Sequence, residues 1–205
     1  MSDPYPRIRI NPKRLSAYPW YLRPFFWNQR RKYGAVLDSA LLWARSPGLF
    51  LGVAILYGLI DRSSSPIEPA LRSLLTVRVS QINGCPFCVD LNSATLLKRG
   101  AEIEKVEAVD CWRESSLFND RERAALGYAE AMTRSDDGAL DGIFADLRCH
   151  FDDNTVIELT GLIAFQNMSS KFNSALGVQP QGFCHLRIPA GLAPVSGSEG
   201  GVVPN

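Results

Sequence analysis

The chain has 205 residues, 46% of them hydrophobic, and its 22 basic and 21 acidic residues give a formal net charge of +1. Such a chain can bury one sizeable core, or form one domain with an extension. Its near-zero net charge gives no general electrostatic basis for binding nucleic acid, so we expect no nucleic-acid partner.

The amino-terminal segment differs from the rest in charge and aromatic content. Residues 1–33 contain eight basic residues against one acidic residue, and the stretch YPWYLRPFFWNQRRKYG from Tyr18 to Gly34 mixes aromatics with arginines. Because such side chains are favoured at protein interfaces, we predict that residues 1–45 form a helical arm docked on its own core or on a neighbouring subunit. Contact with a membrane surface and stacking on nucleic acid are the alternatives.

The most apolar stretch is GLFLGVAILYGLI, from Gly48 to Ile60. Spanning a bilayer takes roughly 17 or more apolar residues, so this stretch is too short to cross one. The start of the chain, MSDPYPRIRI, has no apolar run typical of a signal peptide. Ser46 and Pro47 suit the start of a helix. We therefore predict a buried helix here, no transmembrane segment and a cytoplasmic location.

The rest of the chain has the pattern of successive helices. From Glu68 to Ile82, leucine and isoleucine residues lie near one helical face, although TVRVSQI also has the alternation of a strand. Helices are further predicted over 89–99, ending at Gly100, and over 102–112.

Capping residues mark the later helices. Asn119 with Glu122 forms a capping-box pattern, a short helix is expected around 143–147, and Asp153 can cap a longer one. The segment 189–205 is rich in Gly, Pro and Ser and is expected to be a flexible tail. These patterns predict an all-α fold with its main domain over residues 46–188.

Two cysteines in the stretch NGCPFCVD carry the strongest chemical signal. Cys85 stands where a helix would begin, and Pro86 suits the first helical position. The free backbone N–H groups and the positive end of the helix dipole would then favour thiolate over thiol. The two-residue spacer also allows Cys85 and Cys88 to join in a disulfide, or one to capture a sulfenic acid on the other.

Two other interpretations of this pair remain open. It could be half of a zinc site, which would require two further ligands, or it could be two inert buried thiols. The chain has no second CxxC and no HxxxH, and its other candidates, the adjacent pairs Cys149-His150 and Cys184-His185, rarely bind one ion together. Five cysteines in a cytosolic chain of this length do not form a disulfide scaffold. We therefore favour a redox pair and expect no metal.

Three stretches resemble the AhpD-like (alkylhydroperoxidase D-like) group of the carboxymuconolactone decarboxylase family. They are LRSLLTVRVSQINGCPFCVDLNSATLLKRG, WRESSLFNDRERAALGYAEAMT and FDDNTVIELTGLIAFQN. The likeness spans about Ser46 to Leu176. It implies an AhpD-like helical fold with a helical N-terminal extension, assembly as dimers, trimers or hexamers, and peroxidase or thiol–disulfide chemistry at the CxxC.

The resemblance also implies roles for individual residues. Cys88 would attack the peroxide and Cys85 would resolve the resulting sulfenic acid. Where these peroxidases carry a histidine and a glutamate, this chain has Asn92 and Ser73. Neither an amide nor a hydroxyl can accept and return a proton near pH 7 as imidazole does.

Other charged residues near the motif have different expected positions. Arg78, on the preceding helix, is a candidate to face the cysteines and favour thiolate, or else a solvated surface residue. Asp90 should point to a different face of its helix from Cys88. His150 and His185 have no local relation to the pair and are expected to be surface or structural residues.

The sequence therefore predicts a peroxiredoxin-type thiol oxidoreductase that reduces hydroperoxides through a Cys85/Cys88 dithiol–disulfide cycle. It would need an external dithiol reductant but no metal, haem, flavin or nucleotide cofactor, and it would form a homo-oligomer. A non-enzymatic redox sensor or assembly protein of the same fold, and a non-redox lactone decarboxylase, are the alternatives.

Overall fold

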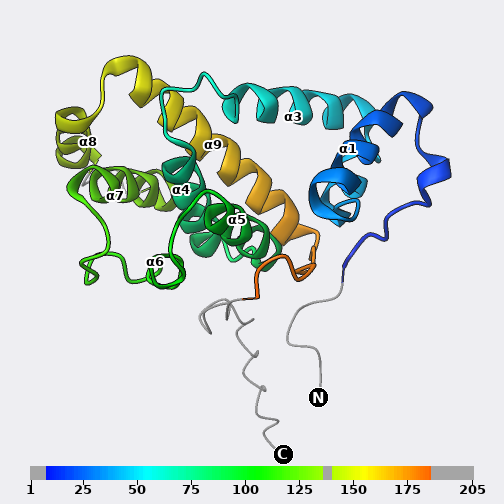
Figure 1. The fold of residues 1–205 in the computed structure, drawn as a ribbon. Helices are drawn as coiled ribbons and strands as arrows, with labels where there is room; N and C mark the ends of the chain where they lie inside the picture. The colour runs from blue at the N-terminus through cyan, green and yellow to red at the C-terminus, as the bar shows by residue number, and fades with distance from the viewer. Residues whose placement is uncertain (1–7, 136–139, 186–205) are drawn as a thin grey trace, which may run out of the picture.

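The computed structural model describes residues 8–135 and 140–185, and within these ranges it is all-helical, without a strand (Figure 1). This confirms the predicted fold class. The elements are two 3-10 helices, η1 (Leu15–Ala17) and η2 (Trp20–Leu22), and the α-helices α1 (Arg23–Tyr33), α2 (Asp38–Trp43), α3 (Pro47–Ile60), α4 (Pro69–Ile82), α5 (Pro86–Lys98), α6 (Ile103–Glu107), α7 (Asp120–Arg134), α8 (Leu140–His150) and α9 (Asp153–Ala175).

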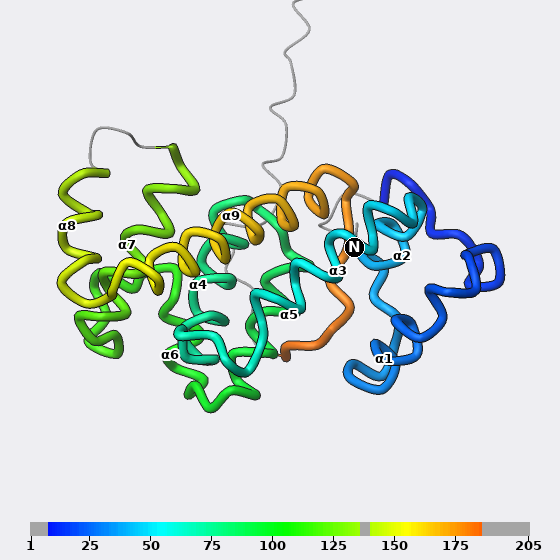
Figure 2. Tube along the Cα trace, turned by 90° about the horizontal axis from the view of Figure 1, so that it is seen from above, coloured from blue at the N-terminus to red at the C-terminus, as the bar shows by residue number. Residues whose placement is uncertain are grey.

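Helix α4 lies at the centre of the molecule and packs against α5, α7 and α9. Figure 2 shows α7 and α8 at one end, α1 and α2 at the other, and α4, α5 and α9 between them. Val77 and Val79 of α4 are both fully buried. A helix surrounded by three others has no solvent face along this stretch, so its valines mimic the alternation of a strand. The strand alternative is wrong.

Local capping chemistry was largely predictable. Asn119 and Glu122 form the expected capping box at the start of α7. The cap of α9 is Asp152, whose carboxylate accepts the N–H of Thr155, so the prediction of Asp153 is one residue late. The expected helix over 102–112 is also shorter than predicted, because α6 ends at Glu107 and turns follow it.

Two hydrophobic clusters divide the interior. The first, which we call the central core, joins α4, α6, α7, α8 and α9. The second, which we call the arm cluster, joins the amino-terminal segment to the cysteine motif. It includes Tyr18, Leu22 and Phe26 of the arm together with Cys85 and Cys88. The arm therefore packs beside the cysteines of its own chain.

Helix α3 is not the buried helix that its composition predicts. Phe50 is its one buried residue, while Ile55 is 62% exposed and Leu59 57% exposed. Figure 1 shows α3 at the edge of the molecule, between α9 and the arm, and it packs on α2 and α9. The prediction assumed that an apolar helix is covered by its own chain, and α3 is covered on one side only.

Within the ranges that the structure describes, no helix is long and apolar enough to cross a membrane. The predicted flexible tail, 189–205, lies outside the described residues. The division into an arm over 1–45 and a domain over 46–188 stays a prediction.

Candidate functional site: a disulfide beside a partly open cavity

The turn between α4 and α5 brings the two cysteines together. Gly84 has a φ of +57°, a left-handed conformation that glycine adopts without strain. Cys85 is then the N-cap of α5, Pro86 its first residue, and the N–H of Cys88 points at the Cys85 sulfur, 3.2 Å away. The two cysteines form a disulfide with Cα atoms 5.3 Å apart, a normal span for this bond.

Both cysteines are shielded from bulk solvent. Cys85 is completely buried and Cys88 is 3% exposed. A cavity of about 440 Å³ adjoins them, however, and Cys88 lines it whereas Cys85 does not. Any molecule that reaches the pair therefore meets Cys88 first. This is the order that the resemblance implies for a peroxidatic and a resolving cysteine.

The wall around Cys88 is aromatic. Trp43, Phe50 and Phe87 line the cavity, and all three belong to the arm cluster. Trp43 stacks on Phe172 of α9 with a centroid separation of 3.5 Å. The cavity therefore offers an apolar surface beside the Cys88 sulfur, and α2 and α3 form much of it.

Asn173 of α9 contacts the Cys88 sulfur directly. Its Nδ2 lies 3.3 Å from Cys88 Sγ and donates to it, while Ser39 Oγ of α2 donates to its Oδ1 at 2.7 Å. Since the Ser39 hydroxyl occupies the carbonyl end of the amide, the N–H end is directed at sulfur. An N–H donor favours a charged thiolate over a thiol.

No pattern near the cysteines indicated Asn173, because it lies 85 residues after Cys88 in the chain. One signal was present: Gln166, Ser170 and Asn173 recur at helical spacing along α9 and are all buried. Buried polar residues on one face of a helix need partners, so this spacing could have indicated a polar site.

Asn92 and Ser73, which replace the family histidine and glutamate, both line the same cavity. Asn92 donates to Ser80 Oγ at 3.1 Å and to the Thr76 carbonyl at 3.4 Å. Ser80 also accepts from Gln166 Nε2 at 2.8 Å. Asn92 thus joins α5 to α4 and, through Ser80, to α9, and its amide group fixes the cavity wall without supplying a titratable group.

Ser73 lies at a charged part of the cavity wall. Its hydroxyl accepts from Arg99 Nη1 at 3.0 Å. Arg99 also binds Asp61, with Nη2 2.6 Å from Oδ1, and the same carboxylate oxygen lies 3.3 Å from Nε of Arg72. Two guanidinium groups therefore share one carboxylate beside the cavity.

Arg78 is held elsewhere. Its Nε and Nη2 lie 2.6 and 2.5 Å from Oε1 of Glu130 on α7, it is 8% exposed, and it is not among the residues that line the cavity. Trp112 and Arg113 also donate to Glu130. Burial alone would raise the pKa of Glu130, but the hydrogen bonds from Trp112 and Arg113 and the charge of Arg78 together lower it.

Asp90 faces away from the cavity, on a different side of α5 from Cys88. Its carboxylate accepts three backbone N–H groups, from Gln181 and Gly182 at 2.9 Å and from Cys184 at 2.7 Å. It therefore anchors the segment after α9 to the helix that carries the cysteines.

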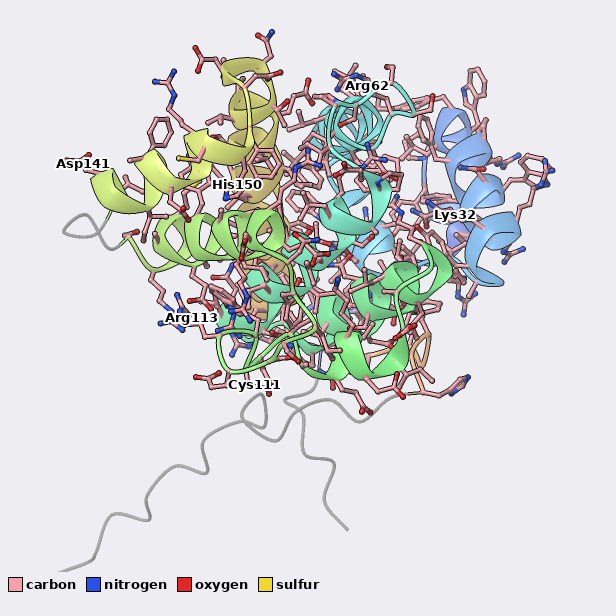
Figure 3. The ribbon with its side chains drawn as sticks, turned by 60° about the vertical axis from the view of Figure 1, so that its left-hand side comes forward. Lys32, Arg62, Cys111, Arg113, Asp141 and His150 are labelled. Atoms are coloured by element: carbon pink, nitrogen blue, oxygen red, sulfur yellow. A yellow bond between two sulfur atoms is a disulfide. The ribbon has the colours of Figure 1, made fainter. Side chains whose placement is uncertain are left out.

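The remaining cysteines and histidines take no part in lining the cavity. Cys111 and Cys149 are exposed, and neither His150 nor His185 lines the cavity. Figure 3 shows Cys111 and His150 well away from Lys32, which lies on α1 and lines the cavity. Within residues 8–135 and 140–185, no group of three or more His, Cys, Asp or Glu side chains could hold a metal ion.

Comparison with known proteins agrees with this architecture. Residues 47–131 match the model of the carboxymuconolactone decarboxylase family. The uncharacterized protein YnjA of Escherichia coli (strain K12) is 43% identical over 172 residues, which cover 84% of this chain and 94% of that protein.

Two solved structures share the fold. One is a protein of unknown function from Agrobacterium tumefaciens, proposed there as an antioxidant defence protein AhpD. It is 31% identical, with a TM-score of 0.64, over 68% of this chain and 94% of that one. The other is an uncharacterized peroxidase-related protein from Ralstonia eutropha JMP134, described as an alkylhydroperoxidase AhpD core. It has 22% identity and a TM-score of 0.79 over 87% of this chain and 95% of that one. The chain therefore belongs to the carboxymuconolactone decarboxylase family and has the helical fold of its AhpD-like members.

Proposed function

We propose that the protein is a thiol oxidoreductase that reduces hydroperoxides through Cys88 and Cys85. One observation carries the proposal: the two sulfurs are joined, and Cys88 lines a partly open cavity whose wall around it is aromatic. Inert structural thiols would not require a cavity at one of them, and a metal site would require further ligands, which the described residues do not provide.

The cycle begins with the reduced pair. The thiolate of Cys88 attacks the terminal oxygen of the hydroperoxide, which carries the hydrogen; the O–O bond breaks, an alkoxide leaves, and the sulfur is oxidised to a sulfenic acid. The alkoxide takes a proton from water and becomes an alcohol. Cys85 then attacks the Cys88 sulfur, the S–S bond forms, and the sulfenic hydroxyl leaves as water.

An external dithiol completes the cycle. It supplies two electrons by thiol–disulfide exchange and becomes a disulfide, so one dithiol is consumed for each hydroperoxide. Such a donor persists in a reducing compartment, and we therefore place the protein in the cytoplasm. Asn173 is the residue that we expect to support the Cys88 thiolate, since no histidine lines the cavity.

Cysteine variants test this function. With hydroperoxide and a dithiol reductant, we expect Cys88→Ser to abolish turnover, and Cys85→Ser to leave a sulfenic acid on Cys88 that dimedone labels. Cys111→Ser is the matched control, because Cys111 is exposed and outside the cavity. It should behave as the wild type.

Other results would contradict the proposal. Unchanged turnover in Cys88→Ser, or an activity that survives alkylation of both motif cysteines, would favour a lactone decarboxylase-type enzyme. A disulfide that opens and closes reversibly without sustained peroxide consumption would favour a redox sensor or assembly protein.

The proposal includes assembly of the chain with copies of itself. Helix α3 contains no charged residue and exposes Leu49, Ile55, Leu56 and Leu59, a contiguous apolar surface of the kind that marks an interface. Its other side lines the cavity through Phe50, Val53 and Tyr57. We expect light scattering to show an oligomer, and Leu56→Glu with Leu59→Glu to dissociate it. A monomeric wild type would contradict this part.

A further inference from the structure

The cavity beside Cys88 has two chemically different ends. Along α5 its wall is formed by Cys88, Asn92, Thr95 and Arg99, whose spacings of four, three and four residues place them on one helical face. With a rise of 1.5 Å per residue, this face is ~16 Å long from Cys88 to Arg99. The sulfur end lies in the apolar arm cluster, and the far end contains Arg99 bound to Asp61.

The far end carries an excess of positive charge. The charged residues that line the cavity are Lys32, Arg72 and Arg99 against a single carboxylate, Asp61. Within the described residues Lys32 makes no ion pair, and its ammonium lies over the rings of Tyr33 and Tyr57. Asp61 serves both arginines. Two of the three cationic charges therefore have no carboxylate of their own in the described structure.

Arg72 is the most buried of these groups and is only partly paired: its Nη1 donates to the Arg62 carbonyl at 3.0 Å. The residue is 4% exposed, and its buried Nε has no hydrogen-bond partner. Asp61 Oδ1 is 3.3 Å from this nitrogen, close enough for an ion pair but out of line for a hydrogen bond. Burial, which Asp61 only partly offsets, lowers the pKa of Arg72. A guanidinium in such surroundings gains from an additional anion.

A neighbouring arginine shows what full pairing looks like. Arg62, labelled near the top in Figure 3, binds both oxygens of Glu158 at 3.0 and 2.5 Å. The chain therefore supplies a dedicated carboxylate to Arg62, outside the cavity lining, and does not supply one to Arg99 or Lys32 within it.

We propose that the cavity binds an organic acid, with its apolar chain along the aromatic wall and its carboxylate at Arg72, Arg99 and Lys32. This inference deepens the proposed function, and its catalytic part rests on that function. The substrate would be a long-chain hydroperoxy acid whose O–O bond lies at Cys88. The cavity of about 440 Å³ is within the size range of small-molecule sites. An extended chain spans the ~16 Å between the two ends.

Binding of unreactive probes tests the site without any turnover. The oxidised protein is titrated with decanoate and with decan-1-ol, and the change in tryptophan fluorescence or the heat of binding gives Kd. We expect decanoate to bind at least tenfold more tightly, and added salt to reduce this preference. Equal affinities, or no binding of decanoate, would overturn the proposal.

Charge variants locate the carboxylate. Arg99→Gln should weaken decanoate about tenfold and leave decan-1-ol unchanged, whereas Lys98→Gln, its exposed neighbour outside the cavity, should change neither. If Arg99→Gln does not fold, as judged by circular dichroism, the Lys32→Gln variant serves as the test. It removes an exposed side chain that makes no ion pair, and it should weaken decanoate binding about threefold. An unchanged Kd in the folded variants would overturn the proposal.

A kinetic comparison separates this inference from the proposed function. With 13-hydroperoxyoctadecadienoic acid and its methyl ester as substrates, the free acid should have the higher kcat/KM, and Arg99→Gln should remove the difference. Decanoate binding without turnover of any hydroperoxide would refute the peroxidase and uphold the acid site. Turnover with no preference for the free acid would uphold the peroxidase and refute the acid site.

Discussion

Two carboxylates in this molecule, the buried Glu130 and the half-buried Asp61, each face two arginines, and their surroundings differ. Glu130, in the central core, binds Arg78 and Arg113, while Asp61, beside the cavity, binds Arg72 and Arg99. The side chain of Arg113 is 53% exposed, so water solvates the surplus charge at Glu130. At Asp61 the side chains of Arg72 and Arg99 are 5% and 20% exposed, and the surplus charge remains at the cavity wall.

The comparison shows that equal numbers of charges do not make equivalent sites. Where surplus charge reaches water, the cluster is part of the scaffold. Where it is confined beside a cavity, it is a candidate for binding an anion, because a low dielectric strengthens electrostatic attraction. The following predictions test whether the two clusters really differ in this way.

The largest expected effect is on stability. Glu130→Gln leaves Arg78 buried without a counter-charge, which typically costs about 3–5 kcal/mol. Asp61→Asn should cost only about 1–2 kcal/mol, because Arg72 keeps its hydrogen bond to the Arg62 carbonyl and Arg99 keeps its hydrogen bond to Ser73. Urea unfolding of both variants measures the difference. A larger loss in Asp61→Asn would reverse the assignment of scaffold and site.

The pH dependence of stability sharpens the same comparison. The pKa of Glu130 is lowered on folding from its ordinary value of 4.5, so its contribution is present above about pH 4.5 and is lost as pH falls through the folded pKa. The difference in unfolding free energy between the wild type and Glu130→Gln should therefore shrink on acidification below pH 4.5. A constant difference would show that the Glu130 charge is not responsible.

A smaller effect, of opposite sign, is expected on ligand affinity. Asp61→Asn removes the carboxylate that competes for Arg72 and Arg99, so decanoate should bind about fivefold more tightly, equivalent to ~1 kcal/mol. Titration of the oxidised variant measures this change. Glu130→Gln is the matched control and should leave Kd unchanged, and weaker binding by Asp61→Asn would place the anion elsewhere.

The last prediction, an effect of similar size, concerns the Cys88 sulfur. Asn173→Leu removes one N–H donor to Cys88, and a hydrogen bond of about 1 kcal/mol corresponds to a roughly fivefold smaller thiolate fraction near neutral pH. The rate of alkylation of reduced Cys88 reports this fraction. Arg78→Gln should leave the rate unchanged. The opposite pattern would restore Arg78 to the site and remove Asn173 from it.

The sequence predicted what depends on local chemistry. The capping box at Asn119, the N-cap at Cys85 with Pro86, and the left-handed glycine at Gly100 after α5 all have the expected positions. Each follows from backbone groups within a few residues, so no knowledge of the tertiary fold was needed.

The features that could not be predicted from the sequence depend on contacts between residues far apart in the chain. The Cys88–Asn173 contact joins residues 85 positions apart, and Asp61 meets Arg99 across 38 positions. The exposure of α3 could not be predicted either. An apolar composition indicates that a helix is covered, but it does not indicate whether the same chain or another one covers it. Arg78 shows the same limit: its partner Glu130 is 52 residues away.

The unequal access of the two sulfurs has a consequence for kinetics. Cys88 borders the cavity and Cys85 is completely buried outside its lining. If the proposed function holds, oxidant and reducing dithiol therefore reach the same atom, the Cys88 sulfur, by the same route. Under the proposed cycle the two half-reactions then alternate, and an alcohol product that lingers blocks regeneration. Parallel lines in double-reciprocal plots, and inhibition of the dithiol step by excess hydroperoxide, are the kinetic signs of such a shared passage.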